Sequence, residues 1–421
     1  MAALVAGTTL FNSAVASDFE EADSLSAANT LPADVVRGQH HRVQETVLND
    51  GYLNYYTIDS DYGEFEAVGA LMLLRRIGEI EALAELDELS KTQAFIEGAA
   101  DAGIQQIRTV RELATNPVET VVGIPSGIGR MFRRWGRQAQ EAIDTAAEVA
   151  SEVGSDGDGR VEVEVGALTE SYFDVDSAQM AWHHKLGTDP YTDNETLQAA
   201  IKEYAWAERL GSVGIRFTGA AQIPGMDIIA AVYDVVWSTD PYELEQLNKE
   251  RLAATGADEA LIDQYLDNPH MTPTHKTLLT AAIAELEGVW GRDGILRQAL
   301  NAESHAEADF FINSVTMLAW YHRNEVPIEA VATSEVLPAA MLTDGSSMFA
   351  FAVDHVYWTE DIADAGERYR ALTSGEYGDT RKVLLLGTAS ERCRNELTER
   401  GFEVRENLGA EIWRDVGRSR D

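Results

Sequence analysis

The sequence predicts an α+β protein that is predominantly α-helical. Three observations carry this prediction. Short strand-like runs separated by turn residues lie near the start of the chain, helical periodicity dominates from about residue 70 to residue 323, and strands alternate with helices after residue 335. We therefore expect an N-terminal β-meander, a central helical bundle and a small C-terminal α/β domain.

The meander is predicted by three runs: Arg42–Leu48, Tyr52–Asp59 and Glu64–Val68. Asn49-Asp50-Gly51 separates the first two and predicts a tight hairpin, because Asp-Gly accepts the positive φ angles that such turns need. Asp61-Tyr62-Gly63 predicts the second turn.

Helical spacing of apolar residues follows from Ala70 to Ala114 and ends at Asn116-Pro117. A further helix is expected from Ser126 to a Gly/Asp-rich linker at Gly154–Gly159. From Ser171 to Arg323 the pattern is helix after helix. Thr188-Asp189-Pro190-Tyr191 recurs as Thr239-Asp240-Pro241-Tyr242. In the second copy Asp or Thr can cap a helix while Pro fits its first turn, and Thr272-Pro273 repeats that pattern.

The sequence pattern after residue 335 predicts a hairpin, two helices and two further strands. These elements are Val336–Leu342, Met348–Trp358, Asp361–Leu372, Lys382–Leu386, Ser390–Arg400 and Phe402–Glu406. The predicted organisation is a signal peptide (1–16), a mobile acidic N-terminus (17–34), the meander with long helices (35–153), a linker with a short strand (154–170), a helical domain (171–325) and the α/β domain (326–421).

The charge of the chain is unusually negative. Asp and Glu number 71 against 33 Lys and Arg, which gives a formal charge of -38. A surface rich in carboxylates stays hydrated in concentrated salt, where screening weakens self-repulsion, so we expect halophilic adaptation. The same charge excludes general nucleic-acid binding, which needs a basic surface.

The first residues predict export. Ala2–Phe11 is apolar, and Ala14-Val15-Ala16 before Ser17 is a small-x-small cleavage pattern, although the usual basic start is missing. The alternative is a buried N-terminal helix. The most apolar later run, Gly211–Trp237, contains charged residues and a proline and is not expected to span a membrane. We therefore expect a soluble protein in the periplasm or outside the cell.

Several segments resemble a family of exported bacterial proteins of uncharacterised function. They are Ser60-Asp61-Tyr62-Gly63-Glu64-Phe65-Glu66, Ser90-Lys91-Thr92-Gln93-Ala94-Phe95, Asn116-Pro117-Val118-Glu119-Thr120 and Gly123-Ile124-Pro125-Ser126-Gly127-Ile128-Gly129-Arg130. The resemblance implies export and brings no known activity, so it assigns no catalytic role.

The helix after Ser126 carries a dense basic stripe. Arg130, Arg133, Arg134 and Arg137 share one helix face, and Phe132 and Trp135 belong to the apolar side. Such a helix can lie on an anionic membrane surface or bind an acidic envelope partner. The alternative is that its apolar face packs on the protein and its arginines pair with the protein's own carboxylates.

No cofactor or metal site is predicted. The nearest metal candidates are His305, Asp309, Glu303 and Glu307, but the two i, i+4 pairs point to different helix faces and no HExxH motif is present. Gly387-Thr388-Ala389-Ser390 lies between a strand and a helix, where backbone amides can hold phosphate, yet a plain turn fits better without a P-loop lysine. Cys393 is the only cysteine, which excludes an intramolecular disulfide.

Two functions remain open. The first is an exported, non-enzymatic protein with a binding or assembly role at the cell envelope or outside the cell. The alternative is a hydrolase or metal-dependent enzyme with a cleft between the helical and C-terminal domains, which would gather His305 or Asp354-His355 with other polar groups. The sequence contains no GxSxG or other complete catalytic motif, which favours the first.

Overall fold

The computed structural model describes residues 18–101, 108–114, 130–131, 134, 175–205, 227–333, 336–373 and 380–409. Over these residues the protein is α+β and predominantly helical, which confirms the predicted fold class. None of the helices in these ranges is long and apolar enough to cross a membrane. The predicted signal peptide and the 154–170 linker lie outside the described residues.

The N-terminal sheet is built around one central strand. Its strands are β1 (Leu25–Ser26), β2 (His41–Val43), β3 (Thr46–Asn49), β4 (Asn54–Ser60) and β5 (Gly63–Val68). All pairings are antiparallel: β5 runs along one side of β4, while β2 and β3 pair with the two ends of its other side. The predicted meander is confirmed, with its first strand divided into β2 and β3.

The predicted hairpin between β3 and β4 is present, but its tip lies one residue later than Asp-Gly suggests. Asp50 N–H donates to Leu53 O at 3.2 Å, which leaves Gly51 and Tyr52 at the tip, and Gly51 takes φ +102°. The Asp50 side chain shifts the turn because its Oδ1 accepts the N–H groups of Tyr52 and Leu53 at 3.0 and 2.8 Å.

The prediction of a mobile segment at 17–34 is wrong for its second half. Residues here form β1, α1 (Ala27–Thr30) and α2 (Ala33–Val36). Ala27, Leu31 and Val35 recur every fourth residue and are all buried in the core of the sheet. The acidic composition of the segment concealed this apolar spacing.

The helical stretch predicted from 70 to 114 is divided into α3 (Ala70–Ser90), α4 (Gln93–Asp101) and α5 (Val110–Ala114). Thr92 accounts for the first break, since its hydroxyl accepts the N–H of Phe95 at 3.3 Å and competes with continuation of α3. The long helix α3 packs on β4 and β5 of the N-terminal sheet, α8 (Glu195–Tyr204) packs on α3, and α7 (Ser177–Leu186) packs on α8.

The central helices are confirmed. They are α9 (Asp227–Ser238), α10 (Pro241–Ala253), α11 (Glu259–Leu266), α12 (Pro273–Glu285), α13 (Gly294–Ala299) and α14 (His305–Asn324). Asp240 and Thr272 cap α10 and α12 with proline in the first turn, as predicted.

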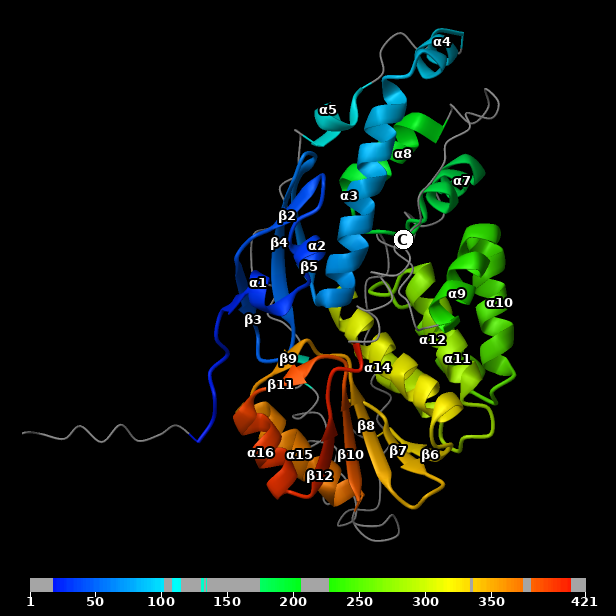
Figure 1. Cartoon of the computed structure of the whole chain (residues 1–421). Helices are drawn as coiled ribbons and strands as arrows, with labels where there is room; N and C mark the ends of the chain where they lie inside the picture. The colour runs from blue at the N-terminus through cyan, green and yellow to red at the C-terminus, as the bar shows by residue number, and fades with distance from the viewer. Residues whose placement is uncertain are drawn as a thin grey trace, which may run out of the picture.

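The C-terminal sheet has the strand order β12-β10-β8-β7-β6. Its strands are β6 (Ile328–Ala332), β7 (Ala339–Leu342), β8 (Ser347–Phe351), β10 (Arg381–Leu385) and β12 (Phe402–Arg405). β8, β10 and β12 are parallel, connected by α15 (Glu360–Leu372) and α16 (Glu391–Glu399), while α14 packs on β8 (Figure 1). A short parallel pair, β9 (His355–Val356) and β11 (Thr388–Ala389), lies at the carboxyl ends of β8 and β10.

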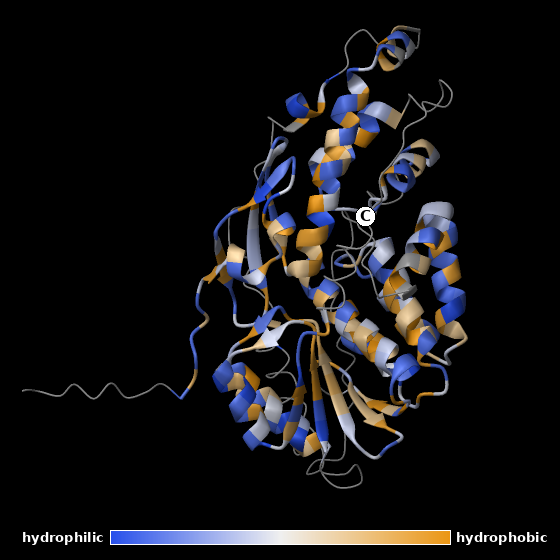
Figure 2. Cartoon of the chain, viewed as in Figure 1, coloured by the Kyte–Doolittle hydropathy of each residue, from blue (hydrophilic) through white to orange (hydrophobic). Residues whose placement is uncertain are grey.

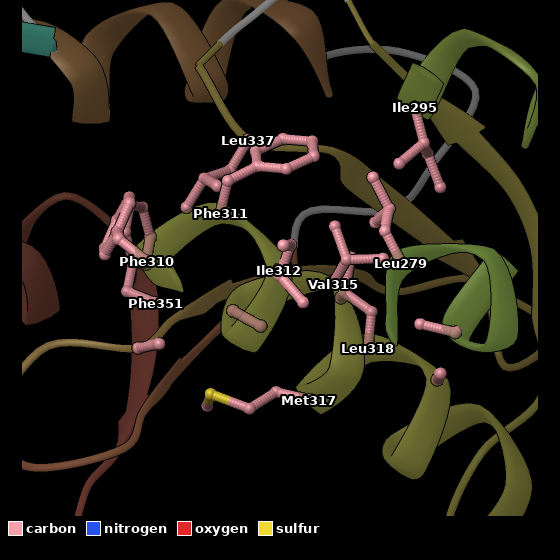
Figure 3. Close-up of a cluster of buried hydrophobic side chains, with 14 of the residues drawn as sticks. Leu279, Ile295, Phe310, Phe311, Ile312, Val315, Met317, Leu318, Leu337 and Phe351 are labelled. Atoms are coloured by element: carbon pink, nitrogen blue, oxygen red, sulfur yellow. The ribbon is translucent and has the colours of Figure 1, made fainter. Parts of the chain in front are cut away.

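Among the described residues, buried apolar side chains form two cores. The first contains the N-terminal sheet, α3, α7 and α8, and the second joins α9–α14 to the C-terminal sheet. In Figure 2, β6 and β7 carry hydrophobic colours, in agreement with their buried residues. Figure 3 shows the second core, where Phe311 and Val315 of α14 lie among side chains of α12, α13 and the sheet. The predicted boundary at residue 326 falls inside this core.

Candidate functional site at the junction of the two cores

Polar side chains gather where α3, from the first core, meets α12 and α14, from the second. Arg75 lies in the second turn of α3, His275 in the first turn of α12, and His305 and Asp309 in the first turns of α14. Figure 1 shows the start of α14 beside the start of α3. We call these four residues the junction cluster.

The cap of α12 fixes the tautomer of His275. The Thr272 N–H donates to His275 Nδ1 at 3.3 Å, while the Thr272 hydroxyl accepts the His275 N–H at 3.1 Å. Because Nδ1 accepts, the ring proton is on Nε2, which lies 3.2 Å from Asp309 Oδ1 and donates to it. Both ring nitrogens of His275 are therefore occupied.

Asp309 is ionised in spite of its burial. Burial opposes its charge, but Arg75, with Nη2 at 3.3 Å from Oδ1, and His275 together hold the pKa of Asp309 well below its usual range. Burial opposes the charge of Arg75 as well, but the nearby charge of Asp309 raises the pKa of Arg75. Both groups of the ion pair therefore carry full charge. Among the described residues, the second oxygen, Oδ2, is buried and has no hydrogen-bond partner.

His305 is the second imidazole of the cluster, beside His275. Its ring lies edge-on to that of His275, with 5.8 Å between centroids. Burial lowers the pKa of His305, and His275 lowers it further, against the opposing charges of Asp193 and Asp309. A neutral imidazole can accept a proton or bind a metal, so His305 is the chemically versatile member of the cluster.

A second polar network ties α3 to the loop that precedes α8. Arg76 lies 2.6 Å from Glu79 and 2.8 Å from Asp193. Glu79 is 1% exposed and also accepts from Thr192 and from Asn194 Nδ2, the latter at 3.0 Å. Both carboxylate oxygens of Glu79 are thus hydrogen-bonded inside the protein, which points to a structural role.

The first Thr-Asp-Pro-Tyr copy does not start a helix. Asp189 instead accepts the Tyr191 N–H at 2.9 Å and the Thr274 hydroxyl at 2.7 Å, while Tyr233 O–H donates to its Oδ2 at 3.4 Å. Asp189 therefore joins the loop to α9 and α12, beside the junction cluster.

Arg134 binds two of the predicted metal candidates. Its guanidinium lies 2.8 Å from Glu303 and 2.8 Å from Glu307 and also donates to Asn301 O at 2.8 Å. Arg134 is helical and only 18% exposed at its side chain, whereas Arg130 is exposed. Four further residues predicted to contribute to this helix lie outside the described residues: Arg133 and Arg137 of the stripe, and Phe132 and Trp135 of the apolar side.

The four metal candidates are not brought to one point. Asp309 pairs with Arg75 and His275, His305 stands beside them, and Glu303 and Glu307 face Arg134. Within the described ranges, no three His, Cys, Asp or Glu side chains are placed to hold a metal ion.

Asp354 and His355 bind residues outside the junction cluster, and each binds different partners. Asp354 accepts the N–H groups of Asn54 and Ala70 at 2.8 and 2.9 Å, at the first turn of α3. Burial raises the pKa of Asp354 to about 6, against those two donors. His355 Nδ1 lies 2.6 Å from the Thr388 hydroxyl, within the β9–β11 pair.

The other predicted candidates serve the fold. Cys393 is fully buried, and burial raises the pKa of its thiol to about 12, so it is not a reactive thiolate. In the Gly387–Ser390 turn, Ser390 Oγ caps α16 by accepting the Cys393 N–H at 2.9 Å.

Sequence reasoning missed Arg75 and Asp189. A usable pattern existed for Arg75: it is half of an Arg-Arg pair that directly follows the apolar run Ala70–Leu74, and a buried arginine requires a carboxylate partner. No comparable pattern identified Asp309 as that partner.

The chain matches no known family, no curated protein and no solved structure, so the resemblance to exported bacterial proteins stays a prediction.

Proposed function

We propose that this chain is an exported, non-enzymatic protein with a binding or assembly role at the cell envelope or outside the cell. Export is supported by the apolar Ala2–Phe11 run and the small-x-small pattern before Ser17. The net charge of -38 is suited to a protein that functions in concentrated salt, where screening weakens the repulsion among its carboxylates.

One observation carries the choice of binding over catalysis: the helical part and the C-terminal sheet share a continuous apolar core. Phe310 and Phe311 of α14 are buried, and the Ala352 N–H beyond β8 donates to Ser314 of α14 at 3.1 Å. The enzyme alternative places a cleft between these two parts, and the apolar packing between them supports a binding role over that alternative (Figure 3).

Three members of the junction cluster support the same choice. A general base needs a ring nitrogen that faces substrate, whereas both nitrogens of His275 are bonded inside the protein. Arg75 and Asp309 neutralise each other across the two cores. His275, Arg75 and Asp309 thus have the character of a joint between the cores.

The helix that starts near Ser126 is the proposed contact with an anionic membrane surface or an acidic envelope partner. Arg134 does not belong to that contact, because its guanidinium is bonded to Glu303 and Glu307. Arg130, Arg133 and Arg137 remain as the proposed binding residues.

The binding proposal is tested with the triple variant Arg130→Gln, Arg133→Gln, Arg137→Gln, in which Arg134 is kept so that the fold is preserved. Sedimentation with vesicles of anionic lipid should show at least tenfold weaker binding than wild type, and vesicles of zwitterionic lipid serve as the control. Unchanged binding, or no binding by the wild type, would remove the membrane surface from the proposal.

Export and the absence of catalysis are tested on protein purified from its native compartment in high salt. Mass spectrometry should find a mature chain beginning at Ser17 outside the cytoplasm. Metal analysis should find less than stoichiometric transition metal. One equivalent of bound zinc, iron or manganese would instead favour the metal-dependent enzyme.

A further inference from the structure

The first described residues pass from one core to the other. Phe19 packs against the second core, whereas Leu25, in β1, packs against the first. The two residues are separated by a short acidic segment, so residues 18–23 connect the C-terminal sheet region with the N-terminal sheet. We call residues 18–23 the strap.

Glu20 fastens the strap to the second core. The Glu20 N–H donates to Trp358 O at 2.8 Å, and its carboxylate accepts the Trp358 N–H at 2.6 Å. Ser390 Oγ donates to the same carboxylate oxygen at 2.5 Å. Glu20 therefore satisfies both backbone groups of Trp358, as a neighbouring strand would. Arg392 adds a bond to the carbonyl of Asp18.

The strap binds beside the place where the hairpin tip of the N-terminal sheet also makes contact. Trp358 follows β9, and the Tyr357 N–H beside it donates to Gly51 O at 3.1 Å, in the hairpin tip of the N-terminal sheet. The Asp354 N–H donates to Tyr52 O at 3.0 Å in the same tip. Strap and hairpin tip thus hold adjacent residues at the carboxyl edge of the parallel strands.

The Glu20 contacts are within reach of solvent. Glu20 forms one wall of an open groove of about 460 Å³ along the outer face of α16, together with Arg392 and Asn395. The contacts of Glu20 are hydrogen bonds at the surface and not deep apolar packing, so they can open without disrupting either core.

We propose that the strap is a releasable clamp across the two cores, with Glu20 as its latch. When Glu20 leaves, the Trp358 N–H and C=O and the Ser390 hydroxyl lose their partners. The adjoining contacts between the hairpin tip and residues 354–357 then open more often, because the strap and the tip bind the same short stretch of backbone. The clamp therefore sets how often residues 354–358, at the carboxyl edge of the parallel strands, are uncovered.

Hydrogen–deuterium exchange of the full chain tests the clamp. In Glu20→Ala, the amides of Trp358, Tyr357 and Asp354 should exchange at least tenfold faster than in wild type, while α14 keeps its protection. Glu21→Ala removes the neighbouring exposed carboxylate and should change none of them. Faster exchange at Trp358 alone would show a local contact and overturn the clamp, as would no change at all.

The wild-type chain provides a second measurement that does not depend on a variant folding. In native-state exchange with low denaturant, Trp358 and Tyr357 should share one opening that is at least tenfold more frequent than the opening of α14. If Trp358 exchanges only together with α14, in global unfolding, the strap is not releasable and the proposal fails.

Discussion

His275 Nε2 lies 3.2 Å from Asp309 Oδ1, and this contact joins the first turn of α12 to the second turn of α14. The same oxygen lies 3.3 Å from Arg75 of α3. One carboxylate oxygen therefore holds three helices from two cores, and its charge is balanced mainly by a residue of the other core. The stability of the junction depends on this carboxylate being ionised.

Asp309→Asn should destabilise the protein by about 3 kcal/mol at neutral pH, because it leaves the guanidinium of Arg75 without its main counter-charge. Denaturant unfolding in high-salt buffer measures the change. The low pKa of Asp309 means that its contribution is present above the pKa of an unfolded aspartate and is lost as the pH falls. Asp309→Asn should therefore approach wild-type stability in acid.

The matched test is the double variant Arg75→Met, Asp309→Leu. Because it removes both charges, it should be less destabilised than the sum of the two single variants by at least about 1 kcal/mol. Additive effects would show that the 3.3 Å contact is not an energetically coupled ion pair.

Local structure was predictable here because its causes are local. Asp240 and Thr272 cap helices from their own first turns, and Gly401 ends α16 with φ +84°. The junction was not predictable, since Arg75 and Asp309 are 234 positions apart and nothing in either sequence neighbourhood identifies the other as its partner. The sequence predicted that the four arginines share one helix face. It did not predict that Arg134 pairs with Glu303 and Glu307, because that contact depends on where α14 begins.

Arg134→Gln should cost about 1–3 kcal/mol, because Glu303, Glu307 and Asn301 O all lose a charged donor and Glu307 is 8% exposed. Thermal unfolding measures the effect. Arg405→Gln is the control: Arg405 also binds a carboxylate, Glu325, but at 46% exposure, so the loss should stay below about 1 kcal/mol. Equal effects of the two variants would contradict a structural role for Arg134.

His183 should make the protein sensitive to acid. The side chain is fully buried, its Nδ1 lies 2.9 Å from the Thr188 hydroxyl, and burial lowers its pKa to about 3. An unfolded histidine titrates near pH 6.5, so the unfolded state binds a proton first, and stability falls as the pH drops below about 6.5. Between pH 7 and pH 4.5 this loss is about 2.5 kcal/mol.

His183→Gln removes the titrating ring and should abolish that part of the pH dependence. The test is the difference in unfolding free energy between the variant and wild type, measured by urea titration from pH 7 to pH 4.5. A difference that stays constant with pH would mean that His183 is protonated without cost in the folded protein.

Asp354 should act in the opposite direction. Its pKa of about 6 in the fold exceeds that of an unfolded aspartate, so its contribution is fully present below about pH 4 and is lost as the pH rises through 6. Relative to Asp354→Asn, which does not titrate, wild type should lose about 2.4 kcal/mol of advantage between pH 4 and pH 7. Urea unfolding of both proteins at the two pH values checks the sign, and an advantage that grows with pH would contradict it.

Two glycines near the C-terminal sheet should respond to alanine in opposite ways. Gly366 lies within α15, and an added Cβ would meet Phe402 at 3.8 Å and Leu397 at 4.0 Å, beside an apolar cavity of about 30 Å³. Gly366→Ala should therefore stabilise the protein by about 1 kcal/mol through helix propensity and added contacts.

At Gly387 the added Cβ would lie 1.9 Å from Asp354 O, so Gly387→Ala should cost more than about 2 kcal/mol. Thermal unfolding of the two variants measures both signs, and a destabilised Gly366→Ala would mean that the cavity closes by repacking of Phe402 in the wild type.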